Sequence, residues 1–492
     1  MLSRRECVRV LAAILMAGAL LSRGVVLAST PFELQNDIEG IIRDAGVGST
    51  EVSVTVLDPD ADITLAAINA DELMIPASNM KLLSSGGALV ALGSEFVFKT
   101  RIIWSPENGG TLIVQGDGDP AFGDPVLLME QDRGVEDFLG AMVNAVVDAG
   151  INQIGELVID DRIFDRTYVH PSWPREQLNR WYCAEVAGLN FHTNLIRVFT
   201  HPEDVGRPPV VALEPEAPWL TVVNSARSVK SGSHTAWVAR RLTSNAMTLR
   251  GDVRYASDPV EVALHEPTTF FGELLQARLR EVGLGPERVR LADPEESAPE
   301  GRTILIVETP IETALRRCNV NSYNLYAEAL IKRLGHEVTG MPGSWSNGAA
   351  SLRLIMLDRL GAVTSDHVRI ADGSGMSREN RVTTALLASW LQSFHLDADL
   401  REPFVASLAT TGPKGTLRKR FRTVRLENEI RAKTGYLSGV TALSGYMIHP
   451  ATDRRIVFSI ITNDKPAKVA LSTVRLMEER IAERVDEWLS AQ

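Results

Sequence analysis

Ser78 and Lys81 form the first pair in the sequence whose residue types and spacing suit catalysis. They lie three residues apart, and on a helix this spacing directs both side chains to one face. A largely apolar run from Met80 to Leu92 follows, so we expect Ser78 to open a buried helix, close to free backbone N–H groups. Burial would lower the pKa of Lys81 from its ordinary value of about 10.4. The pair predicts a serine nucleophile beside a lysine base, although the spacing alone also fits a capped helix with a solvated lysine.

Two later motifs strengthen this interpretation. Ser322 and Asn324 lie two residues apart in an amphipathic segment, and Lys433, Thr434 and Gly435 precede a strand-like run. Ser-x-x-Lys, Ser-x-Asn and Lys-Thr-Gly, in this order, are the combined motifs of serine enzymes that recognise penicillin. We therefore expect an acyl-serine enzyme in which the three motifs meet at one site.

The sequence resembles the class C low-molecular-mass penicillin-binding proteins, which form the peptidase S13 family of D-alanyl-D-alanine carboxypeptidases and endopeptidases. The resemblance extends beyond the three motifs and covers nearly everything after residue 28. The further stretches that carry it are residues 116–120, 182–185, 321–328, 372–378, 415–417 and 443–446.

The resemblance implies catalytic roles for three side chains. Ser78 would attack the carbonyl of the penultimate D-alanine, and Lys81 would accept the proton of its hydroxyl. Ser322 would relay protons between Lys81, Lys433 and the leaving amine. The product would be an acyl-enzyme that water hydrolyses.

The resemblance also implies five substrate-binding residues, namely Asn324, Lys433, Thr434, Gly435 and Tyr436. Asn324 would hydrogen-bond either the substrate's backbone amide or Lys81. With Lys81 neutral, a charged Lys433 and the Thr434 hydroxyl would attract the terminal carboxylate of the substrate.

Tyr436 is a departure from the family pattern, which usually has a small hydroxyl residue after Lys-Thr-Gly. Its backbone N–H would still form an oxyanion hole with that of Ser78, and one such donor is worth about 3–4 kcal/mol. Tyr323 is a second departure, because Asp or Asn is more typical between the Ser and Asn of the second motif. Both departures bear on substrate preference and turnover rather than on acylation.

The implied function is that of an exported serine DD-peptidase. It would remove the terminal D-alanine from peptidoglycan stem peptides, cleave D-alanyl cross-links, or do both, and β-lactams would acylate it. Two other classes stay open: a serine β-lactamase, and a catalytically slow peptidoglycan-binding or penicillin-sensing protein. The sequence has no recognisable glutamate deacylation motif, and the large insertion does not suit a β-lactamase. No cofactor or metal is expected, because no Cys/His spacing resembles a metal site.

The first 28 residues have the composition of a secretory signal peptide. Arg4, Arg5 and Arg9 precede an apolar run at residues 10–21, and small residues precede an expected cleavage after Ala28. The run is too short for a comfortable membrane span, and no later segment is long and apolar enough for one. We expect export to the periplasm or elsewhere outside the cytoplasmic membrane. The net charge of −11 in 492 residues argues against nucleic acid as a partner.

The pattern of apolar residues predicts an α+β fold. Strand-like runs at 51–57, 441–448 and 455–462 suggest that both ends of the chain close one antiparallel sheet flanked by helices. We expect a split transpeptidase/β-lactamase-like domain made of residues 29–100 and 303–492. The stretch between Ser78 and Ser322 is too long for a loop, so residues 101–302 are expected to be a mostly β insertion of two subdomains.

Cys183 and Cys318 are the cysteines that remain after removal of the signal peptide. An exported protein permits a disulfide. A bridge between them would tie the insertion to the catalytic domain one helical turn before Ser322, provided that the two Cα atoms lie within about 7 Å.

Overall fold

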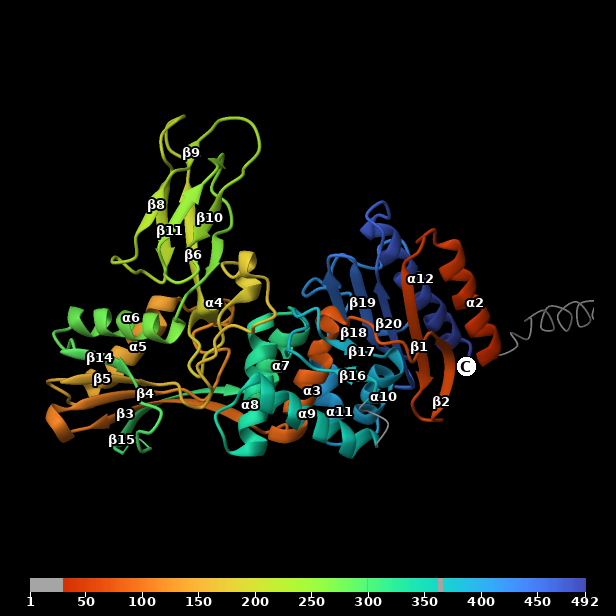
Figure 1. Ribbon diagram of the computed structural model, residues 1–492, viewed down its shortest axis with the longest axis horizontal. Coiled ribbons are helices and arrows are strands. Elements are labelled where there is room, and N and C mark those ends of the chain that lie inside the picture. The colour runs from red at the N-terminus through yellow and green to blue at the C-terminus, as the bar shows by residue number, and fades with distance from the viewer. Residues whose placement is uncertain (1–29, 299, 362–365) are drawn as a thin grey trace, which may run out of the picture.

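A five-stranded antiparallel sheet forms one end of the molecule (Figure 1). The computed structural model describes residues 30–298, 300–361 and 366–492, and the predicted signal peptide lies outside these ranges. The strands follow the order β18 (Glu429–Leu437), β19 (Val440–Ile448), β20 (Arg455–Asn463), β1 (Glu51–Asp58) and β2 (Ile63–Ile68). The prediction that the two ends of the chain close one sheet is therefore confirmed.

Helices cover both faces of this sheet. α2 (Pro31–Asp44) and α12 (Leu471–Ser490) pack together on one face, and α10 (Thr384–His395) packs on the other. β20 shows the reason in its sequence: Ile456, Phe458 and Ile460 join the core beneath α2 and α12, whereas Val457 and Ile461 join the core on the α10 side. Because successive side chains of a strand point to opposite faces, burial on both sides requires a continuous apolar run.

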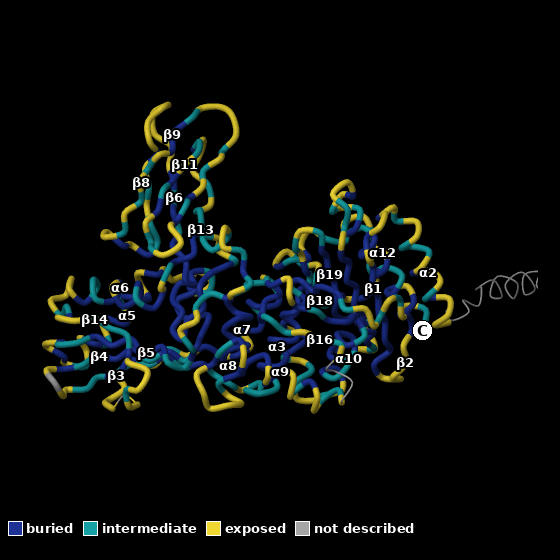
Figure 2. The backbone as a smooth tube through the Cα atoms, in the orientation of Figure 1, coloured by how far each residue is buried: buried dark blue, intermediate teal, exposed yellow. Residues whose placement is uncertain are grey.

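A group of helices next to α10 holds the centre of the molecule. The group consists of α3 (Met80–Leu92), α7 (Ile311–Asn319), α8 (Asn324–Thr339), α9 (Trp345–Leu360) and α11 (Arg401–Ala406), with a short ribbon of β16 (Val368–Arg369) and β17 (Arg381–Val382). α3 packs against α7, α8 and α9, and its first ten residues are buried on all sides (Figure 2). Within the described ranges, no helix combines the length and the apolar character that a membrane crossing needs.

The chain between α3 and α7 builds further sheets. The larger has the order β14-β5-β4-β3-β15 and carries α5 and α6, while three smaller sheets, β13-β6-β7, β10-β11-β8 and β12-β9, project above α4 and α6 (Figure 1). The bounds are β3 (Val97–Ser105), β4 (Thr111–Gln115), α4 (Pro125–Met129), α5 (Val135–Asp148), β5 (Glu156–Asp160), β6 (Leu195–His201), β7 (Val210–Glu214), β8 (Val222–Asn224), β9 (Arg227–Ser228), β10 (Trp237–Arg240), β11 (Met247–Arg250), β12 (Asp252–Val253), β13 (Val260–Ala263), α6 (Pro267–Glu281), β14 (Arg288–Leu291) and β15 (Arg302–Pro310). β3 and β15 pair across the expected junctions, and the division into domains stays a prediction.

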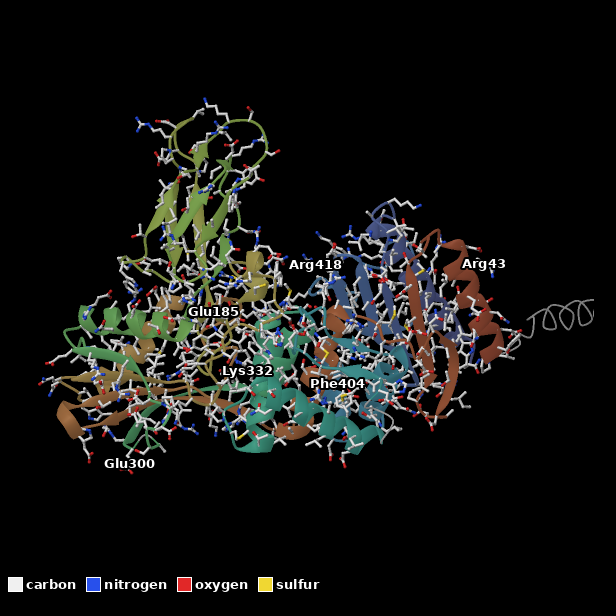
Figure 3. The ribbon with its side chains drawn as sticks, in the orientation of Figure 1. Arg43, Glu185, Glu300, Lys332, Phe404 and Arg418 are labelled. Atoms are coloured by element: carbon white, nitrogen blue, oxygen red, sulfur yellow. The ribbon has the colours of Figure 1, made fainter. Side chains whose placement is uncertain are left out.

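Buried polar contacts join this region to α8. Lys332, which Figure 3 labels on α8, donates from its Nζ to Asp165 Oδ1 at 2.7 Å and to the Thr167 carbonyl at 2.8 Å. Lys332 also lies 4.1 Å from the centroid of the Trp345 ring, a cation–π contact. α8 therefore contacts both the other central helices and the inserted region, residues 101–302.

The disulfide that the sequence left open between Cys183 and Cys318 does not form. Both cysteines are free and lie buried in the same hydrophobic core. Burial raises the pKa of each thiol to about 12, so both stay protonated at neutral pH. The two side chains act as core packing, and packing rather than a covalent link joins the two regions here.

Candidate active site

Ser78 lies in a single turn of 3-10 helix, Ala77–Asn79, that runs directly into α3. Ala77 has a left-handed backbone with φ of 45°, which turns the chain sharply before Ser78. Asn79 Nδ2 donates to Ser444 Oγ at 2.6 Å and ties the turn to β19. Ser78 itself is half-buried, so its hydroxyl is held at the start of a rigid helix while it stays accessible.

Lys81 is fully buried one turn along α3 from Ser78. Its Nζ lies 3.0 Å from Ser78 Oγ, 2.7 Å from Asn324 Oδ1 and 3.0 Å from the Ser374 carbonyl oxygen. Burial lowers the pKa of Lys81 to about 8, against the opposing influence of the Cys318, Glu328 and Asp372 side chains. The lysine can therefore exist as a neutral amine near physiological pH.

The second motif reaches the site from the start of α8. Asn324 is the first residue of this helix, and its Nδ2 donates to the Tyr182 carbonyl at 2.8 Å while its Oδ1 accepts from Lys81. Of the two alternatives expected for Asn324, the structure has the contact with Lys81. Ser322 lies just before the helix with a left-handed φ of 61°, a conformation that an L-residue adopts at some cost.

Lys433 brings the third motif to the same place from β18. Its Nζ donates to Ser322 Oγ at 2.8 Å and to the Thr434 carbonyl at 2.7 Å. Lys433 is fully buried, and burial together with the nearby charge of Lys81 lowers its pKa well below the ordinary value. The charged state of Lys433 during substrate binding stays a prediction.

The rest of the Lys-Thr-Gly-Tyr stretch borders the nucleophile. A Cβ on Gly435 would lie 2.9 Å from the Pro76 carbonyl oxygen, so glycine allows β18 to approach the turn that holds Ser78. Thr434 is half-buried beside it, while the Tyr436 side chain is 53% exposed with the Arg475 guanidinium 5.7 Å from its ring centroid. The strand therefore lines one side of the site with backbone and directs Tyr436 to solvent.

The Ser374 carbonyl is a part of the site that the sequence did not reveal. It belongs to the Gly-rich loop at residues 372–377, part of one of the stretches that carry the family resemblance. Asp372 fixes the loop by accepting from the N–H groups of Gly375 at 2.8 Å and Ser377 at 2.6 Å. Trp173 of the inserted region donates to the same carboxylate at 2.9 Å. The inserted region thus supports the site, although all three motifs lie outside it.

Replacing Gly375 should disturb Ser78 through the backbone. Gly375 has φ of +80°, and a Cβ there would overlap the Ala77 carbonyl immediately before the nucleophile. We expect Gly375→Ala to lose about 1–2 kcal/mol of stability from the backbone conformation alone, and also to slow acylation. Gly340→Ala is the matched control, because Gly340 has φ of +69° with no neighbouring atom within 4 Å. Equal acylation rates in the two variants, measured with a chromogenic β-lactam, would contradict this prediction.

Within the described part of the chain, no group of three or more His, Cys, Asp or Glu side chains is placed to hold a metal ion. The chemistry of the site lies in its hydroxyl, amine and amide groups. Two serine–lysine pairs, Ser78 with Lys81 and Ser322 with Lys433, lie where the turn that holds Ser78 packs against β18. Such an arrangement suits nucleophilic acyl transfer with proton relay.

An antiparallel sheet flanked by helices, with Ser-x-x-Lys, Ser-x-Asn and Lys-Thr-Gly gathered at one site, defines the penicillin-binding class of serine enzymes. Comparison with known proteins agrees. The model of the D-Ala-D-Ala carboxypeptidase 3 (S13) family matches residues 34–484. The chain therefore belongs to this family of serine-type hydrolases.

Individual relatives match over most of their length. A D-alanyl-D-alanine carboxypeptidase from an Actinomadura species is 29% identical over 474 residues, covering 92% of this chain and 85% of the relative. The crystal structure of penicillin binding protein 4 from Haemophilus influenzae has a TM-score of 0.76 at 20% identity, covering 91% of this chain and 99% of that one. Its complex with a β-lactam has a TM-score of 0.70 at 20% identity, over 92% and 99% of the two chains. These structures share the fold with this chain.

Proposed function

We propose that this protein is an exported serine DD-peptidase that acts on peptidoglycan stem peptides ending in D-Ala-D-Ala. The observation that carries the proposal is the contact set of Lys81, whose Nζ lies within 3.0 Å of Ser78 Oγ and of two oxygen acceptors. A neutral amine has two N–H groups and one lone pair. Asn324 Oδ1 and the Ser374 carbonyl take the two N–H groups, so the lone pair faces the Ser78 hydroxyl.

The proposed reaction begins with transfer of the Ser78 proton to Lys81 Nζ. Ser78 Oγ then forms a bond to the carbonyl carbon of the penultimate D-alanine, and the carbonyl oxygen takes the negative charge under the N–H groups of Ser78 and Tyr436. The bond to the terminal D-alanine breaks, and Ser322 passes a proton to its amine. Water then attacks the ester and releases the shortened peptide.

Recognition of the terminal carboxylate is assigned to Lys433 and the Thr434 hydroxyl. The pKa of Lys433 is lowered in the substrate-free site. The negative charge of a bound substrate carboxylate would raise this pKa again. Substrate binding and protonation of Lys433 then favour each other. Lys81 and Lys433 titrate as a coupled pair, so their apparent pKa values describe the pair and not either lysine alone.

Export, acylation by β-lactams and endopeptidase cleavage are three parts of the proposal that rest on the family and on the predicted signal peptide. Export rests on the predicted signal peptide at residues 1–28. Acylation by β-lactams rests on the matched motifs and on the solved β-lactam complex of a protein that shares the fold. Endopeptidase cleavage rests on the same acyl transfer, in which the leaving amine belongs to a second stem peptide instead of free D-alanine.

Release of D-alanine tests the proposal directly. The purified protein is incubated with a soluble pentapeptide ending in D-Ala-D-Ala and, separately, with a cross-linked peptide dimer. The proposal predicts one D-alanine released per pentapeptide, and separated monomers from the dimer where endopeptidase activity is present. Penicillin binding without turnover of either peptide would favour a sensing or binding protein, and rapid hydrolysis of penicillin would favour a β-lactamase.

Tyr436→Thr should improve binding of D-Ala-D-Ala peptides. The exposed Tyr436 replaces a hydroxyl that would hold the substrate carboxylate, and one charge-assisted hydrogen bond contributes about 1.5–3 kcal/mol. We expect KM to fall by at least about tenfold, with a smaller change in penicillin acylation. Tyr255→Thr is the control, since Tyr255 is 52% exposed and lies in the inserted region. An unchanged KM would show that Thr434 already supplies this contact alone.

A further inference from the structure

Glu328 is a buried carboxylate close to the site for which none of the three motifs gives a role. It lies on α8 one turn after Asn324, so both side chains point to the same side of the helix. The side chain is fully buried, and a buried carboxylate is costly unless several donors satisfy it. Its neighbours therefore show what the fold uses it for.

Three N–H groups bind the Glu328 carboxylate. Oε1 accepts from the Ser374 N–H at 2.8 Å, and Oε2 accepts from the Gly373 N–H at 2.8 Å and from Trp345 Nε1 at 2.7 Å. Two of these donors belong to adjacent backbone amides of the Gly-rich loop. One side chain thus holds two consecutive peptide groups of that loop.

The carbonyl groups of the same two residues point to α3. Ser84 Oγ donates to the Gly373 carbonyl at 2.7 Å, and Lys81 Nζ donates to the Ser374 carbonyl at 3.0 Å. The segment is therefore held from both sides, by Glu328 of α8 at its N–H groups and by α3 at its carbonyls. The position of the Ser374 carbonyl depends on this double attachment.

We propose that Glu328 is a positioning residue for catalysis: it fixes the Ser374 carbonyl as the second acceptor that turns the lone pair of Lys81 toward Ser78. The inference rests on the proposed function, in which neutral Lys81 is the base. Asn324 supplies the first acceptor directly, and Glu328 supplies the second through the backbone. Two residues of α8, Asn324 and Glu328, four positions apart, thus place both acceptors of Lys81.

The charge of Glu328 also acts on Lys81. A nearby negative charge favours the protonated lysine, so removing it lowers the pKa of Lys81. Burial raises the pKa of Glu328 itself to about 7, and the charge of Asp372 adds to this effect. The titratable groups that face Glu328 from the surrounding elements are Lys81, Cys183, Cys318, Lys332 and Asp372.

Glu328→Gln separates positioning from simple support of the fold. The carboxamide keeps the size of the side chain but has only one accepting oxygen, so its NH2 group must face a loop N–H. The readout is the rate constant of penicillin acylation across pH, corrected for the folded fraction by active-site titration. Glu478→Gln is the matched control, because Glu478 is equally buried but pairs with Arg420 and Thr441 on the opposite side of the sheet.

We expect Glu328→Gln to lower the acylation rate at its high-pH plateau by about tenfold or more, and to move the ascending limb by about half a pH unit or more toward lower pH. Glu478→Gln should change neither quantity. The inference would be overturned if the ascending limb of Glu328→Gln stayed at the wild-type pH. It would also be overturned if Glu478→Gln lost as much of the plateau acylation rate. If Glu328→Gln does not fold, Ser84→Ala tests the same attachment from α3, and an unchanged plateau there would overturn it. Failure of the wild-type protein to be acylated at all would instead contradict the proposed function.

Discussion

Ser78→Ala should abolish both penicillin acylation and release of D-alanine. The variant lacks the only atom that forms the covalent bond, and loss of the nucleophile in a comparable serine enzyme costs about a millionfold in kcat. The fold should be retained, because the half-buried Ser78 hydroxyl makes one hydrogen bond of modest net worth, about 1 kcal/mol. Thermal unfolding and D-alanine release measured on one preparation check both expectations.

A matched serine controls for the loss of a hydroxyl from the helical centre. Ser351 on α9 is buried, and its hydroxyl makes no hydrogen bond to any residue that the structure describes. Ser351→Ala should therefore keep full activity with nearly unchanged stability. Measurable turnover by Ser78→Ala, above that of a preparation treated with penicillin, would show that another residue is the nucleophile.

Lys81→Ala should slow acylation by about a hundred- to ten-thousandfold, the usual contribution of a general base. The change also leaves Asn324 Oδ1 and the Ser374 carbonyl without their lysine donor. In the wild-type protein the pKa of Lys81 is lowered to about 8, so the neutral amine predominates above that pH and the ammonium below it. Acylation should therefore rise with pH through about 8, and this rise should disappear in Lys81→Ala.

The descending limb of the same profile reports Lys433. In the free site burial and Lys81 lower the pKa of Lys433, whereas a bound carboxylate raises it. The descending limb of kcat, which reflects the substrate complex, should therefore lie at higher pH than that of kcat/KM. Lys332→Met is the control for removal of a buried lysine: it breaks the pair with Asp165 and lowers stability, but its folded fraction should still be acylated. Coincident limbs for kcat and kcat/KM would contradict the assignment of Lys433.

The motifs of this site were predictable from sequence because each is a short local pattern. Ser78 and Lys81 lie one turn apart where a helix begins, so local spacing already placed their side chains together. Lys433 was expected before the strand that became β19, but it lies within β18, which was not among the predicted strands. The closing of the sheet by both ends of the chain followed from strands with clear apolar patterns at each end.

The Ser374 carbonyl and Glu328 were not predictable in the same way. A backbone carbonyl carries no residue-type signal, and only tertiary packing brings the Gly-rich loop against α3. One sequence signal for Glu328 does exist, an acidic residue within the apolar stretch of α8 one turn after Asn324. The lowered pKa of Lys433 and the free thiols of Cys183 and Cys318 also depend on burial and distance, which spacing along the chain does not determine.

The location of a penicillin adduct tests most directly whether Ser78 forms the acyl-enzyme. The protein is incubated with penicillin, digested with a protease, and the modified peptide is identified by mass spectrometry at several times. We expect one penicilloyl group per molecule, attached to Ser78 and persisting far longer than the acyl group of a peptide substrate. An adduct on any other residue, or rapid turnover of penicillin with no adduct on Ser78, would contradict this expectation.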